Sequence, residues 1–376
     1  MTDLPLPRPA ATAGFATEVG TRRFRDRSVD AAHAVPRHFR PAPGGVTLSS
    51  LGLGTYIGRP DAATDLAVEE AVRISVGSGR INVVDTAINY RYQRAERSVG
   101  RALHRLFEAR ALQRDEVFVA TKVGYFAPDG ESPIPTDEWI ERELVRPGIL
   151  DPVDIVAESH AMSPSYLRDQ AERSRTNLGL ECVDLLYLHN APDAQLPVIG
   201  RTQFRERLLA AFRVFEELRS DGKLRSYGLA TWDCLRADPG SRSYLSLADA
   251  VELAVEAGGR DHGLRFVQFP FNLAMTEAAV VRNQIVAGVE MTLFESAERL
   301  GLGCFTSVPL VQGQLARLGP ALDGLTSAQT ALQLARSPPH GLAALVGQKT
   351  PEHLAENLKL SEVPPLDPSR FQEWLG

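Results

Sequence analysis

An alternation of two kinds of segment dominates the chain from residue 46 onward. Short apolar runs are each followed by longer segments in which apolar residues recur every three or four positions. This pattern is typical of βα units, in which a buried parallel strand leads into an amphipathic helix. Eight strands are predicted, at residues 46–55, 81–87, 117–123, 183–189, 226–231, 266–271, 304–308 and 342–347. Eight helices are predicted between or after them, at residues 65–76, 95–109, 164–178, 203–220, 245–257, 293–300, 327–335 and 351–358.

Eight strictly alternating units predict an α/β fold, and among such folds they favour a closed (β/α)8 TIM barrel. An open doubly wound sheet with helices on both faces is the alternative. A barrel can absorb more than about 250 residues as one domain, so residues 46–376 are predicted to form a single catalytic barrel. Residues 1–45 are rich in Pro, Ala, Arg and Thr without a sustained period, which predicts a flexible leader that ends against the barrel bottom.

Charge and cysteine content exclude several classes of partner. The chain carries 41 Lys and Arg against 47 Asp and Glu, a net charge of −6, so nothing draws it as a whole to nucleic acid or to an anionic membrane. It has no run of about 18 apolar residues and no secretory signal pattern. Its three cysteines lie far apart, without the spacing of a zinc site. A reducing, cytoplasmic setting with no bound metal is expected.

Two connections are longer than simple turns. Residues 124–163 follow the third predicted strand and residues 272–292 follow the sixth, so in a barrel both stand on the C-terminal face as enlarged loops. We expect them to be candidate substrate lids. The first contains a charged cluster, which is either a solvated face or, if it reaches the site, a sign of a polar, hydroxylated substrate. The cluster comprises Asp129, Glu131, Asp137, Glu138, Arg142 and Arg146.

Polar residues stand at or just after the ends of three consecutive predicted strands. Asp85 and Tyr90 follow the second strand, Lys122 closes the third and His189 closes the fourth. In a barrel these positions converge on one mouth. A phenol has an unperturbed pKa near 10, and a neighbouring ammonium lowers it. We therefore expect Lys122 to activate Tyr90 as a general acid while Asp85 holds Lys122. His189 is expected to hydrogen-bond the oxygen being protonated, which describes carbonyl reduction.

Six motifs run in order from about residue 46 to residue 359: LGLGTY at 51–56, NVVDTAINYRYQRAERSVGRAL at 82–103, ATKVG at 120–124, DLLYLHN at 184–190, VQFPFN at 267–272 and GQKTPEHLAENL at 347–358. Together they resemble the aldo/keto reductase superfamily. The resemblance implies a (β/α)8 barrel, a nicotinamide dinucleotide cofactor and an Asp/Tyr/Lys/His tetrad that reduces aldehydes or ketones. Carried over by position, the tetrad is Asp85, Tyr90, Lys122 and His189. The five-residue offset from Asp85 favours Tyr90 over Tyr92.

The cofactor site is expected in the eighth unit. No GxGxxG follows a predicted strand, so a Rossmann turn is excluded. Thr350 reads as an N-cap and Pro351 as the first helical residue, so this helix offers N–H groups to a phosphate. The resemblance implies NADPH, with NADH left open because His353 stands where many relatives have an arginine for the 2′-phosphate. The cofactor residues it implies are Gly54, Thr55, Tyr56, Gln268, Ser307, Leu310, Gly347, Lys349, Thr350, His353, Glu356 and Asn357.

Two departures from the family pattern affect the nicotinamide. Ala230 and Thr231 replace a Ser-Asn pair that usually grips the carboxamide, which leaves Gln268 to supply one hydrogen bond. Ser307 aligns with an aromatic residue that stacks on the ring. Either Phe305 turns in from a shifted register or this stacking is lost.

A small carbonyl compound is the expected partner. Tyr125 and Trp232 are the predicted substrate contacts, and Tyr56 and Phe126 are further aromatic residues at matching strand ends. Two other functions stay open. One is a cofactor-binding redox sensor or scaffold with poor turnover, which the altered carboxamide and stacking positions favour. The other is a lyase or epimerase that uses the same Tyr/Lys pair.

Overall fold

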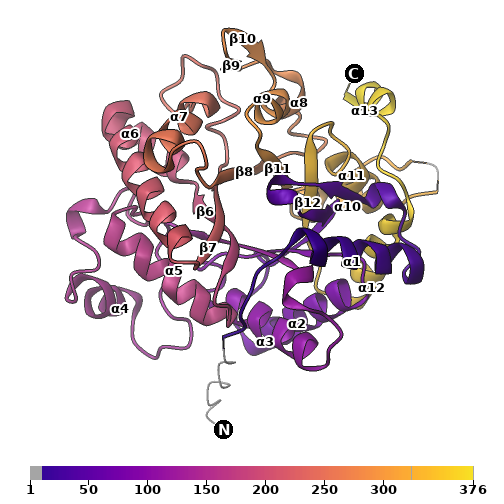
Figure 1. Ribbon diagram of the computed structural model, residues 1–376, viewed down its shortest axis with the longest axis horizontal. Coiled ribbons are helices and arrows are strands. Elements are labelled where there is room, and N and C mark those ends of the chain that lie inside the picture. The colour runs from indigo at the N-terminus through magenta and orange to yellow at the C-terminus, as the bar shows by residue number, and fades with distance from the viewer. Residues whose placement is uncertain (1–10, 323, 376) are drawn as a thin grey trace.

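The computed structural model describes residues 11–322 and 324–375, and a closed barrel of eight parallel strands forms its centre (Figure 1). Hydrogen bonds join the strands in the order β11-β12-β3-β4-β5-β6-β7-β8. The predicted (β/α)8 barrel is confirmed, and the open doubly wound sheet is wrong. The barrel strands are β3 Leu51–Gly54, β4 Val83–Asp85, β5 Phe118–Val123, β6 Val183–His189, β7 Leu224–Ala230, β8 Leu264–Pro270, β11 Gly303–Ser307 and β12 Gly341–Gly347.

A ring of helices surrounds these strands (Figure 1). The helices of the eight units are α2 Ala62–Gly77, α3 Arg94–Glu108, α5 Pro164–Leu178, α6 Ala191–Ser220, α7 Leu247–Gly258, α9 Leu293–Arg299, α11 Ser327–Ala335 and α12 Pro351–Leu358. Most lie within a few residues of their predicted bounds, but α6 begins well before residue 203. It joins two helical pieces across Gly200, whose φ of 76° breaks the helix, and it contains Pro197. Because proline and glycine interrupt a helical pattern, the sequence did not predict the part of α6 before residue 203.

Large side chains fill the inside of the barrel. Tyr187, Phe266 and Phe305 are fully buried there, together with Phe118 and Leu345. The ring centroids of Phe266 and Phe305 are 5.7 Å apart. The interior is therefore a packed core, and the open space for chemistry lies at the strand ends.

The segment before the barrel is folded. Helix α1 Glu18–Ala31 buries Phe24, and strand β1 Phe39–Pro41 pairs antiparallel with β2 Thr47–Ser49. Leu48 of β2 packs in the same cluster as the barrel interior. Residues 11–45 are thus folded rather than flexible, and Ala16 and Ala42 pack on the barrel-interior cluster. Residues 1–10 lie outside the described part of the chain.

The two long connections have their own structure. The first contains α4 Thr136–Ile140, and Trp139, Leu144 and Tyr166 form an apolar cluster beneath it. The second contains α8 Glu277–Val280 and a hairpin of β9 Gln284–Val286 and β10 Val289–Met291, which Figure 1 shows at the periphery beside α9. Helices α10 Gln314–Leu318 and α13 Pro368–Leu375 complete the described α-helices.

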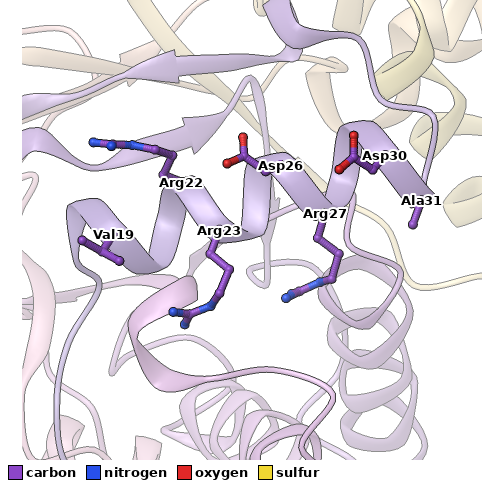
Figure 2. Close-up of a pocket in the computed structure, with 7 residues that line it drawn as sticks. All are labelled: Val19, Arg22, Arg23, Asp26, Arg27, Asp30 and Ala31. Atoms are coloured by element: carbon purple, nitrogen blue, oxygen red, sulfur yellow. The ribbon is translucent and has the colours of Figure 1, made fainter.

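The outer face of α1 carries an open depression of about 600 Å³ (Figure 2). Two of its arginines are already paired: Arg23 and Arg27 both contact Glu116, which stands just before β5. This depression is therefore at the N-terminal end of the barrel, opposite the strand ends that carry the predicted tetrad. Its lining residues are Val19, Arg22, Arg23, Asp26, Arg27, Asp30 and Ala31. Among the described helices, none is long and apolar enough to cross a membrane.

Candidate active site

Strand register brings the predicted tetrad to one rim of the barrel. Asp85 ends β4 and lies opposite Gly54 of β3 and Ala120 of β5. Lys122 is the penultimate residue of β5, and His189 ends β6. The same parallel ladder therefore brings three side chains of the predicted tetrad to neighbouring positions, as the order of the motifs predicts.

Lys122 is at the centre of this group and is completely buried. Its Nζ donates to Asp85 Oδ2 at 2.6 Å, to the carbonyl oxygen of Thr86 at 2.9 Å and to Tyr90 Oη at 3.1 Å. The second oxygen of Asp85 accepts from Gln268 Nε2 at 2.9 Å. All three protons of the ammonium are thus used, and one of them is directed at the phenol.

Tyr90 reaches Lys122 from the turn that follows β4. Its backbone N–H donates to the carbonyl oxygen of Ala87 at 3.1 Å. Its ring meets the rings of Tyr56 and His189 edge-on, with centroids 5.0 and 5.7 Å away. Tyr92, the competing tyrosine of the sequence, is 48% exposed. The geometry therefore brings Tyr90 to the ammonium.

Burial sets the balance of charge at the phenol. Burial raises the pKa of Tyr90, and the ammonium of Lys122 lowers it by less, so the pKa lies above the ordinary value of 10.0. Burial lowers the pKa of Lys122, but Asp85 and Tyr90 together raise it by more. The pKa of Lys122 therefore lies above its ordinary value of 10.5. Lys122 lowers the pKa of the phenol as expected, but desolvation outweighs the nearby charge, so the net pKa is not below its ordinary value.

His189 is a neutral imidazole. Burial, the Lys122 ammonium and His160 together hold the pKa of His189 well below its usual value. Its Nδ1 is buried and has no hydrogen-bond partner among the described residues. An unpaired buried N–H costs more than an unpaired acceptor, so the proton is favoured on Nε2. This tautomer makes His189 a hydrogen-bond donor.

Two residues that sequence reasoning missed support this rim. His160 Nε2 lies 3.0 Å from the carbonyl oxygen of His189, and its Nδ1 lies 2.9 Å from Gln195 Nε2. Asp193 accepts three backbone N–H groups of the loop after β7, including that of Trp232 at 3.0 Å. Asp193 follows His189 by four residues and could have been recognised as a capping carboxylate. His160 gave no local signal.

The start of α12 has the geometry expected of a phosphate site. Thr350 is its N-cap and accepts from the backbone N–H of His353 at 3.3 Å, and Pro351 is its first residue. The N–H of Glu352 has no acceptor within the helix and needs one from outside. Lys349 Nζ donates to the carbonyl oxygen of Ile57 at 2.8 Å, which brings the loop after β3 to this helix. The residues present therefore fit a dinucleotide phosphate.

Glu356 and Asn357 both contact other parts of the protein. Glu356 accepts from the hydroxyl of Thr326, and its backbone carbonyl oxygen accepts from Gln329 Nε2 at 2.7 Å. Asn357 is buried and donates to Gln348 Oε1 at 2.9 Å. Its own Oδ1 has no partner among the described residues.

The ends of β3, β11 and β12 carry other predicted cofactor residues. Gly54 and Gly347 pair across β3 and β12, and Ser307 ends β11 with partial exposure. Thr55 donates its hydroxyl to the carbonyl oxygen of Asp85 at 3.1 Å, and Leu310 lies just beyond β11. Phe305 is 1% exposed inside the barrel, where its ring packs against those of Phe118 and Phe266. The ladder between β11 and β12 shifts register between Cys304 and Phe305, and stacking of Phe305 on a nicotinamide stays a prediction.

The remaining departure concerns the end of β7. Ala230 is buried, and the Thr231 hydroxyl donates to the carbonyl oxygen of Gln268 at 3.3 Å. Gln268 itself donates to Asp85. Both polar groups near the expected carboxamide position are thus engaged within the protein.

Aromatic side chains surround the tetrad. The Tyr125 ring lies edge-on to His189 with centroids 5.1 Å apart, while Tyr56 is 60% and Trp232 42% exposed.

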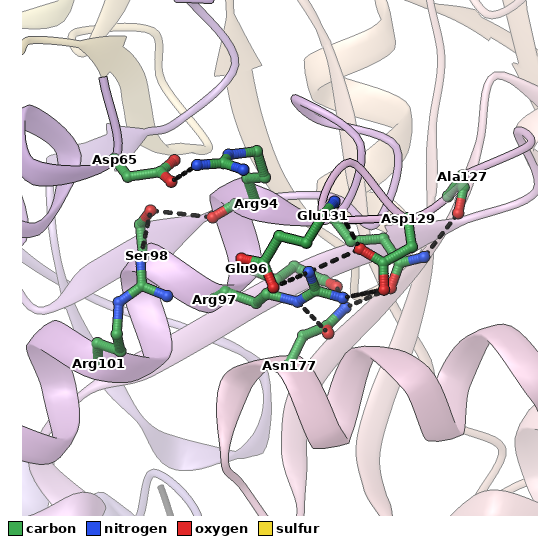
Figure 3. A network of polar contacts seen from close by, with 11 residues as sticks. Asp65, Arg94, Glu96, Arg97, Ser98, Arg101, Ala127, Asp129, Glu131 and Asn177 are labelled. Atoms are coloured by element: carbon green, nitrogen blue, oxygen red, sulfur yellow. Dashed lines mark hydrogen bonds and ion pairs between the residues drawn. The ribbon is translucent and has the colours of Figure 1, made fainter. Parts of the chain in front are cut away.

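Part of the charged cluster in the first long connection is bound to α3. Arg97 binds Asp129 through two bonds of 2.8 Å and Glu131 at 2.9 Å (Figure 3). The structure thus gives no support to a polar lid. Among the described residues, no His, Cys, Asp and Glu side chains are grouped to hold a metal ion.

Comparison with known proteins places this geometry in a family. The sequence model of the Aldo/keto reductase family matches residues 50–238. The chain is 28% identical over 194 residues to the NADH-specific methylglyoxal reductase of Escherichia coli (strain K12), which is 50% of this chain and 50% of that protein. The chain thus matches about half the length of that curated relative.

Solved structures share the fold over nearly the whole chain. An aldo/keto reductase from Klebsiella pneumoniae in complex with NADP and acetate covers 90% of this chain and 94% of its own, with a TM-score of 0.58 and 20% identity. The holo form of an aldo-keto reductase from Bacillus halodurans covers 90% and 95%, with a TM-score of 0.58 and 17% identity. The family match covers half of the chain and includes all four tetrad positions. The chain belongs to the aldo/keto reductase family.

Proposed function

We propose that this protein is an NAD(P)H-dependent oxidoreductase that reduces a small aldehyde or ketone to an alcohol, with Tyr90 as the general acid. The observation that carries the proposal is the buried ammonium of Lys122, which spans Asp85 and the phenol of Tyr90 at 2.6 and 3.1 Å. Because Lys122 is completely buried, its ammonium does not act as a solvated surface charge. Its burial beside a phenol is an arrangement suited to stabilising a phenolate as it forms.

The proton path is set by the charges. Tyr90 donates its phenolic proton to the carbonyl oxygen as negative charge develops there, and Lys122 stabilises the phenolate that remains. Asp85 keeps the ammonium charged and in place. Neutral His189 donates a hydrogen bond from Nε2 to the same oxygen and so polarises the carbonyl. When bound, a nicotinamide dinucleotide supplies the hydride.

The residues proposed to hold the dinucleotide are those at the ends of β3, β11 and β12 and at the start of α12. Lys349, Thr350 and His353 would contact its phosphates, and Asn357 offers an unpaired buried oxygen. Gln268 and Ser307 would contact the nicotinamide end. Structural neighbours have been solved with NADP or NADPH, whereas the curated relative is described as NADH-specific. Both cofactors are therefore candidates.

The proposed substrate is a compact carbonyl compound bound among Tyr56, Tyr125 and Trp232. These aromatic residues offer apolar contact around the tetrad. The name of the curated relative makes methylglyoxal a compound to test first. The three cysteines, Cys182, Cys234 and Cys304, are buried free thiols, which supports the expectation of a reducing, cytoplasmic setting.

The test is a comparison of the purified protein with its Tyr90→Phe variant. NADPH and NADH are each titrated by quenching of tryptophan fluorescence, and oxidation is followed with methylglyoxal and 4-nitrobenzaldehyde. We expect wild-type turnover, and we expect Tyr90→Phe to abolish it with cofactor binding unchanged, because only the proton donor is removed. Binding without turnover on a panel of carbonyls would overturn the reductase in favour of a sensor or an isomerase. Retained turnover in Tyr90→Phe would refute the assigned acid.

A further inference from the structure

Three consecutive residues after Tyr90 have a left-handed backbone. The φ angles of Arg91, Tyr92 and Gln93 are 50°, 56° and 70°. None is a glycine, and other residues adopt this conformation only where their surroundings impose it. The turn connects Tyr90 to α3, so the contacts that impose it also determine where the phenol lies.

Gln93 provides the most complete of these contacts. It is 2% exposed, and its Nε2 donates to the carbonyl oxygen of Ala127 at 2.7 Å. Its Oε1 accepts from Asn177 Nδ2 at 3.1 Å and from Arg97 at 3.5 Å. Both ends of the amide are satisfied within the protein. One buried side chain therefore joins the turn to the connection after β5 and to α5.

The connection after β5 contacts the turn a second time. The backbone N–H of Gly130 donates to the carbonyl oxygen of Tyr92 at 3.0 Å, and a Cβ on Gly130 would lie 2.9 Å from Tyr92 Cβ. Arg97 holds this part of the connection through Asp129 and Glu131 (Figure 3). The connection is thus fixed against the turn from both sides.

Tyr90 is held on both sides along the chain. Before it, the backbone N–H of Ile88 donates to the carbonyl oxygen of Lys122 at 3.2 Å. Its hydroxyl meets Lys122 at 3.1 Å, and its ring touches Tyr56 and His189 edge-on. The turn is the support after Tyr90 and helps to fix the distance from the phenol to Lys122. A shift of the turn would move the phenol relative to the ammonium.

We propose that Gln93 is a positioning residue for the proton donor: by bonding the left-handed turn 91–93 to the carbonyl oxygen of Ala127, it holds the phenol of Tyr90 at Lys122. The long connection after β5 then supports the acid rather than closing over the substrate. This inference rests on the proposed reductase function for its catalytic consequence, but the positioning is measurable without turnover.

The test uses Gln93→Ala and Gln93→Glu. Glutamate keeps the size and the acceptor oxygen, and its ionised carboxylate cannot donate to Ala127, so both variants should behave alike at a pH where the carboxylate is ionised. We expect kcat to fall about 10- to 100-fold in each, because misplacement by about 1 Å costs this much. The NADPH dissociation constant should be unchanged, since the side chain of Gln93 bonds Ala127, Asn177 and Arg97 and none of the proposed cofactor residues. Full kcat in Gln93→Glu would overturn the proposal.

Two further readouts separate positioning from loss of structure. In alcohol oxidation the phenolate acts as base, and a phenol displaced from the ammonium should move the midpoint of the pH profile to higher pH. The charged and polar groups that face the phenol are Lys122, Asp85, His189 and Tyr56. The ¹³Cζ resonance of Tyr90, assigned with Tyr90→Phe, should shift in the Gln93 variants whether or not the protein turns over any carbonyl. An unmoved resonance would overturn the proposal.

The control is Gln203→Ala, which removes an exposed glutamine from α6 and should change neither kcat nor the resonance. If Gln93→Ala does not fold, Gly130→Ala disturbs the same turn from the other side and should give the same losses. If the wild-type chain reduces no carbonyl, the proposed function fails, while the Tyr90 resonance still decides the positioning. A shifted resonance supports it and an unshifted one refutes it.

Discussion

Replacement of Lys122 by methionine is the sharpest test of how the site is held together. Methionine keeps an unbranched chain of similar length but cannot donate. The substitution removes the three bonds that Nζ makes to Asp85, Thr86 and Tyr90. Because Lys122 is completely buried, no water replaces them. Asp85 is then left as a buried carboxylate whose remaining donor is Gln268 at 2.9 Å.

The expected cost arises from that unpaired carboxylate. Removing one partner of a buried ion pair destabilises a protein by about 3–5 kcal/mol. With an unfolding entropy of about 2.1 cal/mol/K per residue, a chain of 376 residues has roughly 0.8 kcal/mol/K in total. The midpoint of thermal unfolding should therefore fall by about 4–6 °C. Carbonyl reduction should be lost as well, because the phenolate has no stabilising charge.

The double variant Lys122→Met/Asp85→Asn is the matched control for stability. It replaces the ion pair by two neutral groups of similar shape, so most of the lost stability should return while activity stays absent. Thermal melts followed by circular dichroism and urea unfolding give the two free energies. A single variant within about 1 kcal/mol of wild type would refute the reasoning, since buried pairs lose more than this when broken. A double variant no more stable than the single one would do the same.

Three further perturbations have defined outcomes. Because burial and Lys122 keep His189 neutral, the rate of reduction should show no titration of this residue between roughly pH 6 and 8; a limb that His189→Gln removes would contradict this. Gly124→Ala places a Cβ 2.6 Å from His160 Nε2, so in urea it should lose about 1–3 kcal/mol more than Gly222→Ala, where φ is also positive but no described atom lies within 4 Å. Burial raises the pKa of Glu96, so the native state binds its proton more tightly and loses stability as pH rises from about 4.5. Glu96→Gln should therefore gain stability relative to wild type with rising pH, and a difference that does not change with pH would refute this.

Short-range pattern in the sequence predicts the barrel and most of the tetrad. The period of apolar residues indicates eight units, and the strand at 183–189 and the helices at 164–178, 327–335 and 351–358 have the predicted bounds. The polar residues at strand ends converge because parallel strands necessarily bring their carboxyl ends to one rim. Asp85, Lys122 and His189 are therefore predictable as neighbours from their order alone.

Other features depend on contacts that no local pattern reveals. Helix α1 has no clear apolar stripe, yet Phe24 is fully buried. His160 lies 29 residues from the carbonyl group that it contacts, and the Gln93 amide bonds a residue 34 positions away. The net pKa of Tyr90 reflects a competition between burial and charge, and the sequence indicates the sign of the charge effect but not the extent of burial. The sequence predicts that Lys122 is part of the site, but it does not predict that Lys122 is completely buried.

The two long connections show why such contacts matter for function. Each connection is hydrogen-bonded to a neighbouring loop that carries a predicted site residue, Tyr90 in one case and Trp232 in the other. Gln93 ties the Tyr90 turn to the connection after β5, and in the connection after β8 Gln284 Nε2 donates to the carbonyl oxygen of Leu235 at 2.9 Å. Asn283 adds a bond to the same loop, three residues beyond Trp232. A lid must break its contacts to open, whereas these connections are joined to the loops by buried amides whose loss costs free energy. The extra length after β5 and β8 therefore favours a preorganised wall, which would position the proposed acid and the proposed aromatic contact before any substrate arrives.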